Sequence, residues 1–243
     1  KISNYFQKKK KIFLNSQYSI ISSDINEKID DVIKYGIDNS VIRIDGLDDN
    51  LEFINNKIIF GKYAYNTRGR HDALNLCASL AVCNIINIPI MNVLNSFKQR
   101  TPLKHRQEFL LEKSGIKFIN DSKSTNVNST LAALDAYEHN IILLMGGAKK
   151  NMPYENLEKT LNKKVKKLIL FGDNSNYIFT KIQNYLNKIK LNNMNEALDY
   201  AISIADKGDV ILLSPGSPSF DTYENFEKRG DHFRSLVESY DNK

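Results

Sequence analysis

The chain of 243 residues has no apolar run long enough to cross a bilayer, and it does not open with the charged and then apolar segment of a signal peptide. Only two cysteines occur, Cys77 and Cys83, and their spacing of six is not that of helical neighbours. No Cys/His spacing typical of a metal site is present. We therefore expect a soluble, cytoplasmic protein with reduced cysteines and no membrane span.

The chain also lacks the phosphate-binding pattern GxxxxGK[ST] of P-loop proteins. Together with a net charge of +6, this absence leaves open a nucleotide- or nucleic-acid-binding module without catalysis. The lysines are scattered, however, and do not alternate with aromatic residues on one strand face. We therefore expect a solvated, lysine-rich surface and no nucleic-acid partner.

Apolar runs and turn residues divide the chain at Pro102. Before it we expect the end of a basic helix, several short strands with one hairpin, and two helices. These segments are 1–14, strand 18–23, a weak helix 27–34 that ends at Gly36, strand 41–44, a hairpin of 51–54 with 57–60, and helices 71–86 and 90–98.

After Pro102 strands and helices alternate. We expect a hairpin of 109–112 with 117–119, then strands 141–145, 165–171 and 209–214, and helices 126–138, 154–163, 174–188, 195–206 and 223–240. Residues 141–145 and 210–213 are uninterrupted apolar runs, which suit a parallel sheet buried on both faces. We therefore predict an α/β protein whose residues 102–243 form a doubly wound, Rossmann-type domain.

Two runs follow predicted strands and open predicted helices: DSKSTN at 121–126 and LSPGSPSFDTYENFEKRG at 213–230. Such corners bind anions, because free backbone N–H groups and the helix dipole point there. Together the two runs resemble the Mur ligases of peptidoglycan synthesis, and the first run resembles the members that add D-glutamate.

The resemblance covers essentially the whole chain. It implies that residues 1–101 are the C-terminal part of a central ATP-binding domain and that 102–243 are the C-terminal domain. It implies a fragment, inactive alone and monomeric, of an ATP- and Mg²⁺-dependent amide ligase. The implied reaction joins D-glutamate to UDP-N-acetylmuramoyl-L-alanine through an acyl phosphate. A different Mur-type ligase, such as folylpolyglutamate synthase, is the alternative within enzymes.

Three segments carry the implied catalytic and nucleotide contacts. KKKIFLN at 9–15 resembles the family run whose first lysine is carbamoylated, so Lys9 is implied as a Mg²⁺ ligand; the alternative is a solvated basic helix face. GRHDALN at 69–75 implies contacts from Asp72 and Asn75 to the adenine base, although the family has Asn where Asp72 stands. Helix capping is the alternative for Asp72.

HRQE at 105–108 resembles the family's interdomain junction. It implies that Arg106 faces the transferred phosphate, to which its forked cation is suited. His105 is implied to order the linker, with a surface histidine as the alternative.

The remaining contacts are implied at the strand ends. Asp121 matches a ribose-binding aspartate, and Lys123 and Thr125 match D-glutamate contacts, with an ordinary capping loop as the alternative. After GG at 146–147, Lys150 matches a lysine that binds a D-glutamate carboxylate, with Lys149 as its competitor. Three further residues match positions on the D-glutamate side: Ser219, Phe220 and Phe226, the last with core packing as its alternative.

Overall fold

A computed structural model describes Lys8 and residues 11–25, 32–36, 42–45, 51–54, 57–61, 70–99 and 103–242. Its backbone contacts separate two compact units, Lys1–Arg100 and Thr101–Lys243. The division lies beside Pro102, where the sequence suggests a boundary. Each unit is described by itself below.

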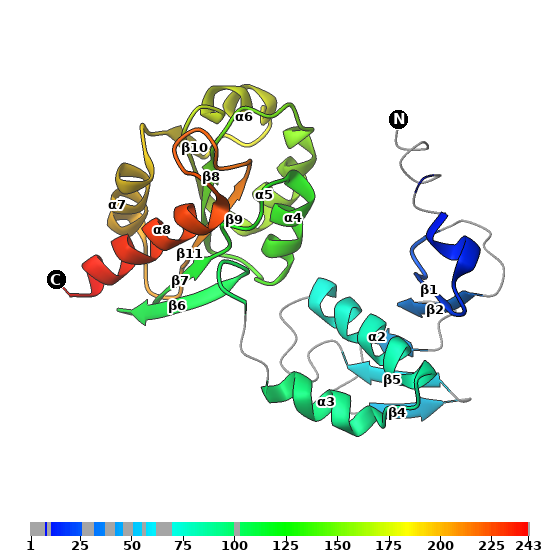
Figure 1. Cartoon of the computed structure of the whole chain (residues 1–243). Helices are drawn as coiled ribbons and strands as arrows, with labels where there is room; N and C mark the ends of the chain where they lie inside the picture. Colours follow the sequence, from blue (N-terminus) through cyan, green and yellow to red (C-terminus); the bar gives the residue numbers. More distant parts are fainter. Residues whose placement is uncertain are drawn as a thin grey trace. The chain divides into compact units, whose positions relative to one another are not determined.

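The N-terminal unit contains a sheet of order β1-β2-β3-β5-β4, whose strands are parallel except for β4 against β5 (Figure 1). A small core packs α2 and α3 around Ile42, Leu76, Leu80 and Leu94, each fully buried. The elements are η1 Lys11–Asn15, β1 Ser19–Ser22, β2 Val32–Gly36, β3 Ile42–Asp45, β4 Leu51–Ile54, β5 Lys57–Gly61, α2 Arg70–Ile85 and α3 Ile90–Gln99.

One prediction for this unit was wrong. Part of the weak helix expected over 27–34 is strand β2, which pairs in parallel with β1 and β3. Val32 and Ile33 are β-branched, and pairing with strands on both sides outweighs the weak local helix signal. Of the basic helix expected over 1–14, the structure describes Lys8, which is helical, and a 3-10 helix that begins at Lys11.

The C-terminal unit is a six-stranded sheet of order β10-β9-β8-β11-β7-β6. All neighbouring strands are parallel except β6, which forms the predicted hairpin with β7. The elements are β6 Glu108–Lys113, β7 Ile116–Asn120, α4 Val127–Asp135, β8 Ile141–Gly146, η3 Tyr154–Leu157, α5 Glu158–Lys164, β9 Val165–Phe171, α6 Ser175–Lys181, β10 Lys188–Lys190, α7 Met194–Ile204, β11 Val210–Gly216 and α8 Phe226–Asp241.

Both faces of this sheet are covered, as the continuous apolar runs predicted. Alternate residues of β8 contribute to two different cores: Ile141 and Leu143 lie in one, Ile142 and Leu144 in the other. Residues of α4, α5 and α6 line the first core, and residues of α7 and α8 line the second (Figure 1). The α/β doubly wound architecture is confirmed.

The prediction of a helix over 174–188 was wrong for the C-terminal part of this segment. Helix α6 stops at Lys181, and Lys188–Lys190 form β10 at the sheet edge. Glu158 accepts hydrogen bonds from the backbone N–H groups of Gln183 and Asn184, which fixes the chain in a non-helical path there. A partner 25 positions away therefore overrides the local pattern.

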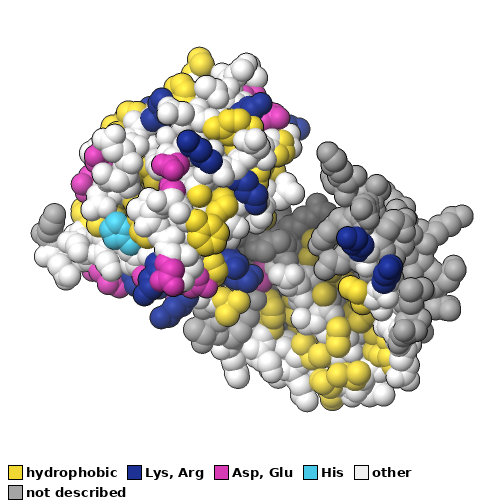
Figure 2. Space-filling model, turned by 45° about the horizontal axis from the view of Figure 1, so that its top comes forward, with side chains coloured by type: hydrophobic (Ala, Val, Ile, Leu, Met, Phe, Trp, Pro, Cys, Tyr) yellow, Lys and Arg dark blue, Asp and Glu magenta, His cyan; other side chains and the backbone are white. Residues whose placement is uncertain are grey.

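On the face that Figure 2 shows, lysine and arginine side chains of the C-terminal unit are interspersed with acidic and hydrophobic ones. Within the described parts of the chain, no helix has both the length and the apolarity that crossing a membrane requires. Cys77 is buried and Cys83 is partly buried, and both are free thiols.

Candidate functional site

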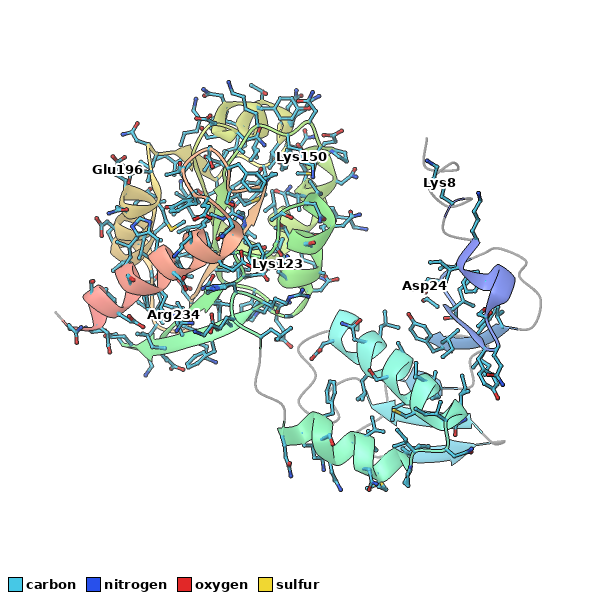
Figure 3. The ribbon with its side chains drawn as sticks, in the orientation of Figure 1. Lys8, Asp24, Lys123, Lys150, Glu196 and Arg234 are labelled. Atoms are coloured by element: carbon cyan, nitrogen blue, oxygen red, sulfur yellow. The ribbon has the colours of Figure 1, made fainter. Side chains whose placement is uncertain are left out.

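Four loops of the C-terminal unit lie at one edge of its sheet. They follow β7, β8, β9 and β11, and because these strands are parallel, their carboxyl ends meet there. The predicted residues Lys123, Thr125, Lys150, Ser219 and Phe220 lie on three of these loops. Figure 3 labels Lys123 and Lys150, which extend from different loops of this unit.

The loop after β7 joins the start of α8 through Lys123 and Phe226. The Lys123 Nζ atom lies 3.8 Å from the centroid of the Phe226 ring, a cation–π contact. Ser122 Oγ donates a hydrogen bond of 2.8 Å to the carbonyl oxygen of Phe226. Phe226 is partly exposed, and its ring also meets that of His105 edge to face. Core packing alone therefore does not describe Phe226, because its neighbours are a cation and an imidazole.

Thr125 precedes α4 and is partly exposed, whereas Asn126 caps that helix by accepting a hydrogen bond of 3.0 Å from the Ser129 N–H group. The segment thus contains a capping residue, as the alternative reading of this loop expects, and that residue is Asn126. The Thr125 hydroxyl is not required for the cap.

Arg229, on α8, joins three of the loops from a fully buried position. Its Nε and Nη2 atoms donate to Ser122 Oγ and to the Ser122 carbonyl oxygen at 3.0 and 2.8 Å. Its Nη1 atom donates to the carbonyl oxygens of Ser217 and Pro218 at 3.0 and 3.1 Å, and more weakly to Gly146 at 3.5 Å. All of these acceptors are neutral oxygens.

Burial lowers the pKa of Arg229 to about 10, against the opposing effect of the Asp221 charge, so the guanidinium remains charged at neutral pH. Arg229 is thus a buried cation that is bonded to neutral oxygens and has the Asp221 carboxylate as a nearby opposite charge. The loop after β8 approaches Arg229 closely: a Cβ atom on Gly147 would collide with its Nη1 atom and with the Pro218 carbonyl oxygen.

The loop after β8 exposes the side chains of both Lys149 and Lys150. The backbone carbonyl of Lys150 accepts a 3.4 Å hydrogen bond from Asn174 Nδ2 on the loop after β9. This bond holds the loop backbone at Lys150, while the side chains of both lysines stay exposed.

The loop after β11 presents Ser219 and Phe220 differently. Ser219 is 2% exposed, and its carbonyl oxygen accepts a 2.9 Å bond from the Tyr223 N–H group. Phe220 is 74% exposed, so its ring is available to a ligand.

Asp121 has partners other than the ribose hydroxyls that the resemblance implies. Its carboxylate accepts hydrogen bonds from the Gln107 N–H group at 3.1 Å, from the Ser214 hydroxyl at 2.9 Å and from the Ser124 hydroxyl. The side chain is 5% exposed, and burial raises its pKa to about 6. In the structure Asp121 ties the junction segment to β11, and a ribose contact remains a prediction.

His105 is buried, so the surface alternative was wrong. Its Nδ1 atom lies 3.0 Å from Asn120 Nδ2, which can only donate, and this assigns the ring proton to Nε2. The Nε2 atom lies 3.5 Å from Asp231 Oδ1. The His105 ring also occupies the space where Gly230 would carry a Cβ atom. His105 therefore fixes the junction segment against α8.

Arg106, next to His105, is exposed. Residues on either side, His105 and Gln107, have positive φ angles of 61° and 46°. Their side chains point into the unit while Arg106 remains outside, a conformation that costs energy at non-glycine residues. Its predicted contact with the transferred phosphate would be made from this exposed position.

The predicted nucleotide residues Asp72 and Asn75 lie in the N-terminal unit. Asp72 is buried in the first turn of α2, and Asn75 is exposed one turn later. Lys9 lies outside the described residues. Among the residues that the structure describes, no group of three or more His, Cys, Asp or Glu side chains could hold a metal ion.

Sequence reasoning missed Arg229, Asn120 and Asn174, which connect the loops. Arg229 lies in a run of charged residues that is typical of a solvent-exposed helix face. The local sequence therefore does not predict that Arg229 is buried. Asn174 lies two residues after a glycine that follows a strand. This glycine was the one indication in the sequence of a turn at that position.

The α/β fold of the C-terminal unit and the loops at its strand ends can now be compared with known protein families. Residues 105–216 match the family model "Mur ligase, glutamate ligase domain". The C-terminal unit is therefore a Mur ligase C-terminal domain.

Curated relatives give the finer comparison. The chain is 35% identical over 237 residues to a UDP-N-acetylmuramoylalanine–D-glutamate ligase of Clostridium botulinum, covering 94% of this chain and 51% of that protein. It is 40% identical over 168 residues to the ligase of the same name from Chlamydia caviae, covering 69% of this chain and 40% of that one. The chain thus spans about half the length of the Clostridium ligase.

Among solved structures, a pseudomurein peptide ligase type C from Methanothermus fervidus matches 99% of this chain and 60% of its own, with a TM-score of 0.67 and 16% identity. A UDP-N-acetylmuramoylalanyl-D-glutamyl-2,6-diaminopimelate–D-alanyl-D-alanyl ligase from Acinetobacter baumannii matches 72% of this chain and 37% of its own, with a TM-score of 0.54 and 16% identity. These likenesses concern the fold alone.

Proposed function

We propose that the chain acts as the C-terminal portion of an ATP-dependent amide ligase that adds D-glutamate to UDP-N-acetylmuramoyl-L-alanine. The observation that carries the proposal is the 35% identity to D-glutamate ligases over 94% of the chain. The loops at the strand ends support it, since they combine exposed lysines with a buried arginine and suit a small dianion.

In the proposed reaction, an oxygen of the substrate carboxylate attacks the terminal phosphorus of ATP, so that ADP leaves and an acyl phosphate forms. The D-glutamate amino group attacks the acyl carbon, the C–N bond forms, and phosphate leaves with its bonding electron pair while the amine loses a proton. Lys123 and Lys150 hold the two D-glutamate carboxylates, Thr125 and Ser219 offer hydroxyl groups, and Phe226 supports Lys123.

For the nucleotide, the proposal carries over the contacts that the resemblance implies. Arg106 faces the transferred phosphate, with His105 positioning the segment that carries it, and Asp72, Asn75 and Asp121 face the nucleotide. Mg²⁺, when bound, would neutralise phosphate charge. Lys9, as a carbamate, would supply an anionic oxygen ligand to it. We further propose that the enzyme works as a cytoplasmic monomer.

The test joins residues 1–243 to the N-terminal half of the Clostridium botulinum relative, so that the fusion spans a complete ligase. Phosphate release is measured with ATP, UDP-N-acetylmuramoyl-L-alanine and one amino acid at a time. We expect turnover with D-glutamate and none above background with L-glutamate or D-alanine. A folded fusion that prefers either of these over D-glutamate would disprove the proposal.

Lysine variants of the fusion test the assigned contacts. Lys123→Ala or Lys150→Ala should raise the KM for D-glutamate about a hundredfold, because one charge-assisted contact is lost, and should change the KM for ATP little. Lys149→Ala is the matched control, with an equally exposed lysine on the same loop. If Lys149→Ala has the large effect and Lys150→Ala does not, the assignment shifts by one residue.

A further inference from the structure

Three buried polar side chains lie under the loop that carries Lys150. Tyr154, Asn174 and Ser217 are 0%, 1% and 0% exposed. They come from η3, from the loop after β9 and from the loop after β11. Asn174 Nδ2 lies 2.8 Å from Tyr154 Oη and 3.0 Å from Ser217 Oγ, and these two oxygens lie 2.7 Å apart.

The Asn174 Nδ2 atom has two hydrogens and three acceptors within reach: Tyr154 Oη, Ser217 Oγ and, at 3.4 Å, the Lys150 carbonyl oxygen. The two hydroxyl oxygens lie close together on one side of Nδ2, so one hydrogen is shared between them and the other is left for Lys150. Tyr154 Oη also lies 3.1 Å from the Gly216 carbonyl oxygen, to which it donates. Each of the three buried side chains therefore has polar partners within the network.

Backbone hydrogen bonds and this network together hold the Lys150 loop at several points. At its start, the Ala148 N–H group donates to the Pro218 carbonyl oxygen at 2.8 Å, and the Asn174 N–H group donates to Gly147 at 2.9 Å. In its middle, Asn174 Nδ2 reaches the Lys150 carbonyl oxygen at 3.4 Å. At its end stands Tyr154, four residues after Lys150. The backbone is thus fixed while the lysine side chain stays exposed.

We propose that Tyr154, Asn174 and Ser217 are positioning residues that fix the Lys150 loop for binding a carboxylate of the amino-acid substrate. This inference rests on the proposed function. A loop that is ordered before the ligand arrives loses less conformational entropy on binding, so the network raises affinity without contacting the ligand. It also couples Lys150 to the loop that carries Ser219, because Ser217 is a member of the network and lies on that loop.

The test uses Tyr154→Phe in the ligase fusion described above, since this change removes one oxygen and keeps the ring. Tyr185→Phe is the matched control: Tyr185 is 4% exposed and its hydroxyl donates to the Val165 carbonyl oxygen at 2.9 Å, in the same core but away from this network. Ser217→Ala is a second way to break the network.

For Tyr154→Phe and Ser217→Ala we expect the KM for D-glutamate to rise about tenfold, with kcat and the KM for ATP unchanged. Tyr185→Phe should change none of these constants. Hydrogen exchange on the 243-residue chain should show faster exchange at 147–153 in Tyr154→Phe than in Tyr185→Phe.

Unchanged KM values for D-glutamate in both network variants would overturn the inference, as would an equal rise in Tyr185→Phe. Failure of the unsubstituted fusion to use D-glutamate would instead count against the proposed function. The exchange measurement is independent of activity, so it still decides whether the network holds the loop.

Discussion

Replacement of Arg229 by lysine tests whether the forked guanidinium holds the strand-end loops together. Lysine keeps the positive charge but concentrates its donors at one point, whereas Arg229 donates to Ser122 through Nε and Nη2 and to Ser217 and Pro218 through Nη1. A lysine can satisfy one of these two groups of oxygens. At least two hydrogen bonds from a charged donor are lost, at about 1.5–3 kcal/mol each.

An opposing contribution comes from the cost of burying the charge. The pKa of Arg229 falls from 12.5 to about 10, so burial, partly offset by the Asp221 charge, penalises the charged form by a net value of about 3 kcal/mol at 1.36 kcal/mol per pKa unit. Replacing Arg229 by methionine would relieve that cost. It would also remove the Arg229 donor from the buried carbonyl oxygens of Ser122 and Ser217, at about 1–3 kcal/mol each, so it should still destabilise the unit.

We therefore expect Arg229→Lys to lower the free energy of unfolding of the C-terminal unit by about 3–5 kcal/mol. The matched control is Arg234→Lys on the same helix, where the arginine is partly exposed and pairs with Glu108, and where the expected loss is below about 1 kcal/mol. Hydrogen exchange of β8 and β11 in increasing urea measures the unfolding of this unit specifically. A difference below about 0.5 kcal/mol between the two variants would refute the reasoning.

Three further predictions follow from the junction segment, from Asp121 and from Lys9. Because the pKa of Asp121 is raised from 3.8 to about 6, the folded state binds the proton more tightly than the unfolded state, so stability should fall by about 2 kcal/mol as pH rises from 4.5 to 7 and then level off. Urea melts across this range should show a smaller fall in Asp121→Asn, and an identical pH dependence in both proteins would contradict the assignment. Gly230→Ala should destabilise the C-terminal unit by about 1–3 kcal/mol, because the new methyl group meets the His105 ring. In a His105→Ala background the same change should stabilise by up to about 1 kcal/mol through helix propensity, and a loss in both backgrounds would mean that the ring is not the obstacle. In the ligase fusion, Lys9 should give a carbamate carbon-13 signal with labelled bicarbonate, and survival of that signal in Lys9→Ala would rule Lys9 out.

Local signals in the sequence were sufficient for much of the C-terminal unit. The apolar runs at Ile141–Gly146 and Val210–Gly216 became buried parallel strands, because a sheet covered on both faces needs continuous hydrophobicity. The turn at Ser114 and Gly115, whose φ angles are 55° and 77°, formed the predicted hairpin. The resemblance of 121–126 and 213–230 singled out two loops that the structure brings to the same sheet edge, because β7 and β11 are parallel neighbours.

Whether β2 and β10 form as strands depended on the strands that pair with them. Val32–Gly36 pairs with β1 and β3, and Lys188–Lys190 pairs with β9. Short segments of this kind have weak propensities of their own, so the hydrogen-bonding partner determines whether they form strands.

The burial of charged and polar side chains depended on tertiary structure most of all. Arg229 is buried because carbonyl oxygens 107 and 83 positions away in the sequence converge on its guanidinium. His105 is buried because Gly230, on a distant helix, leaves room for its ring. The residue types at the site were thus determined by the sequence, whereas their positions were determined by loops that meet only when the parallel strands end at one edge of the sheet.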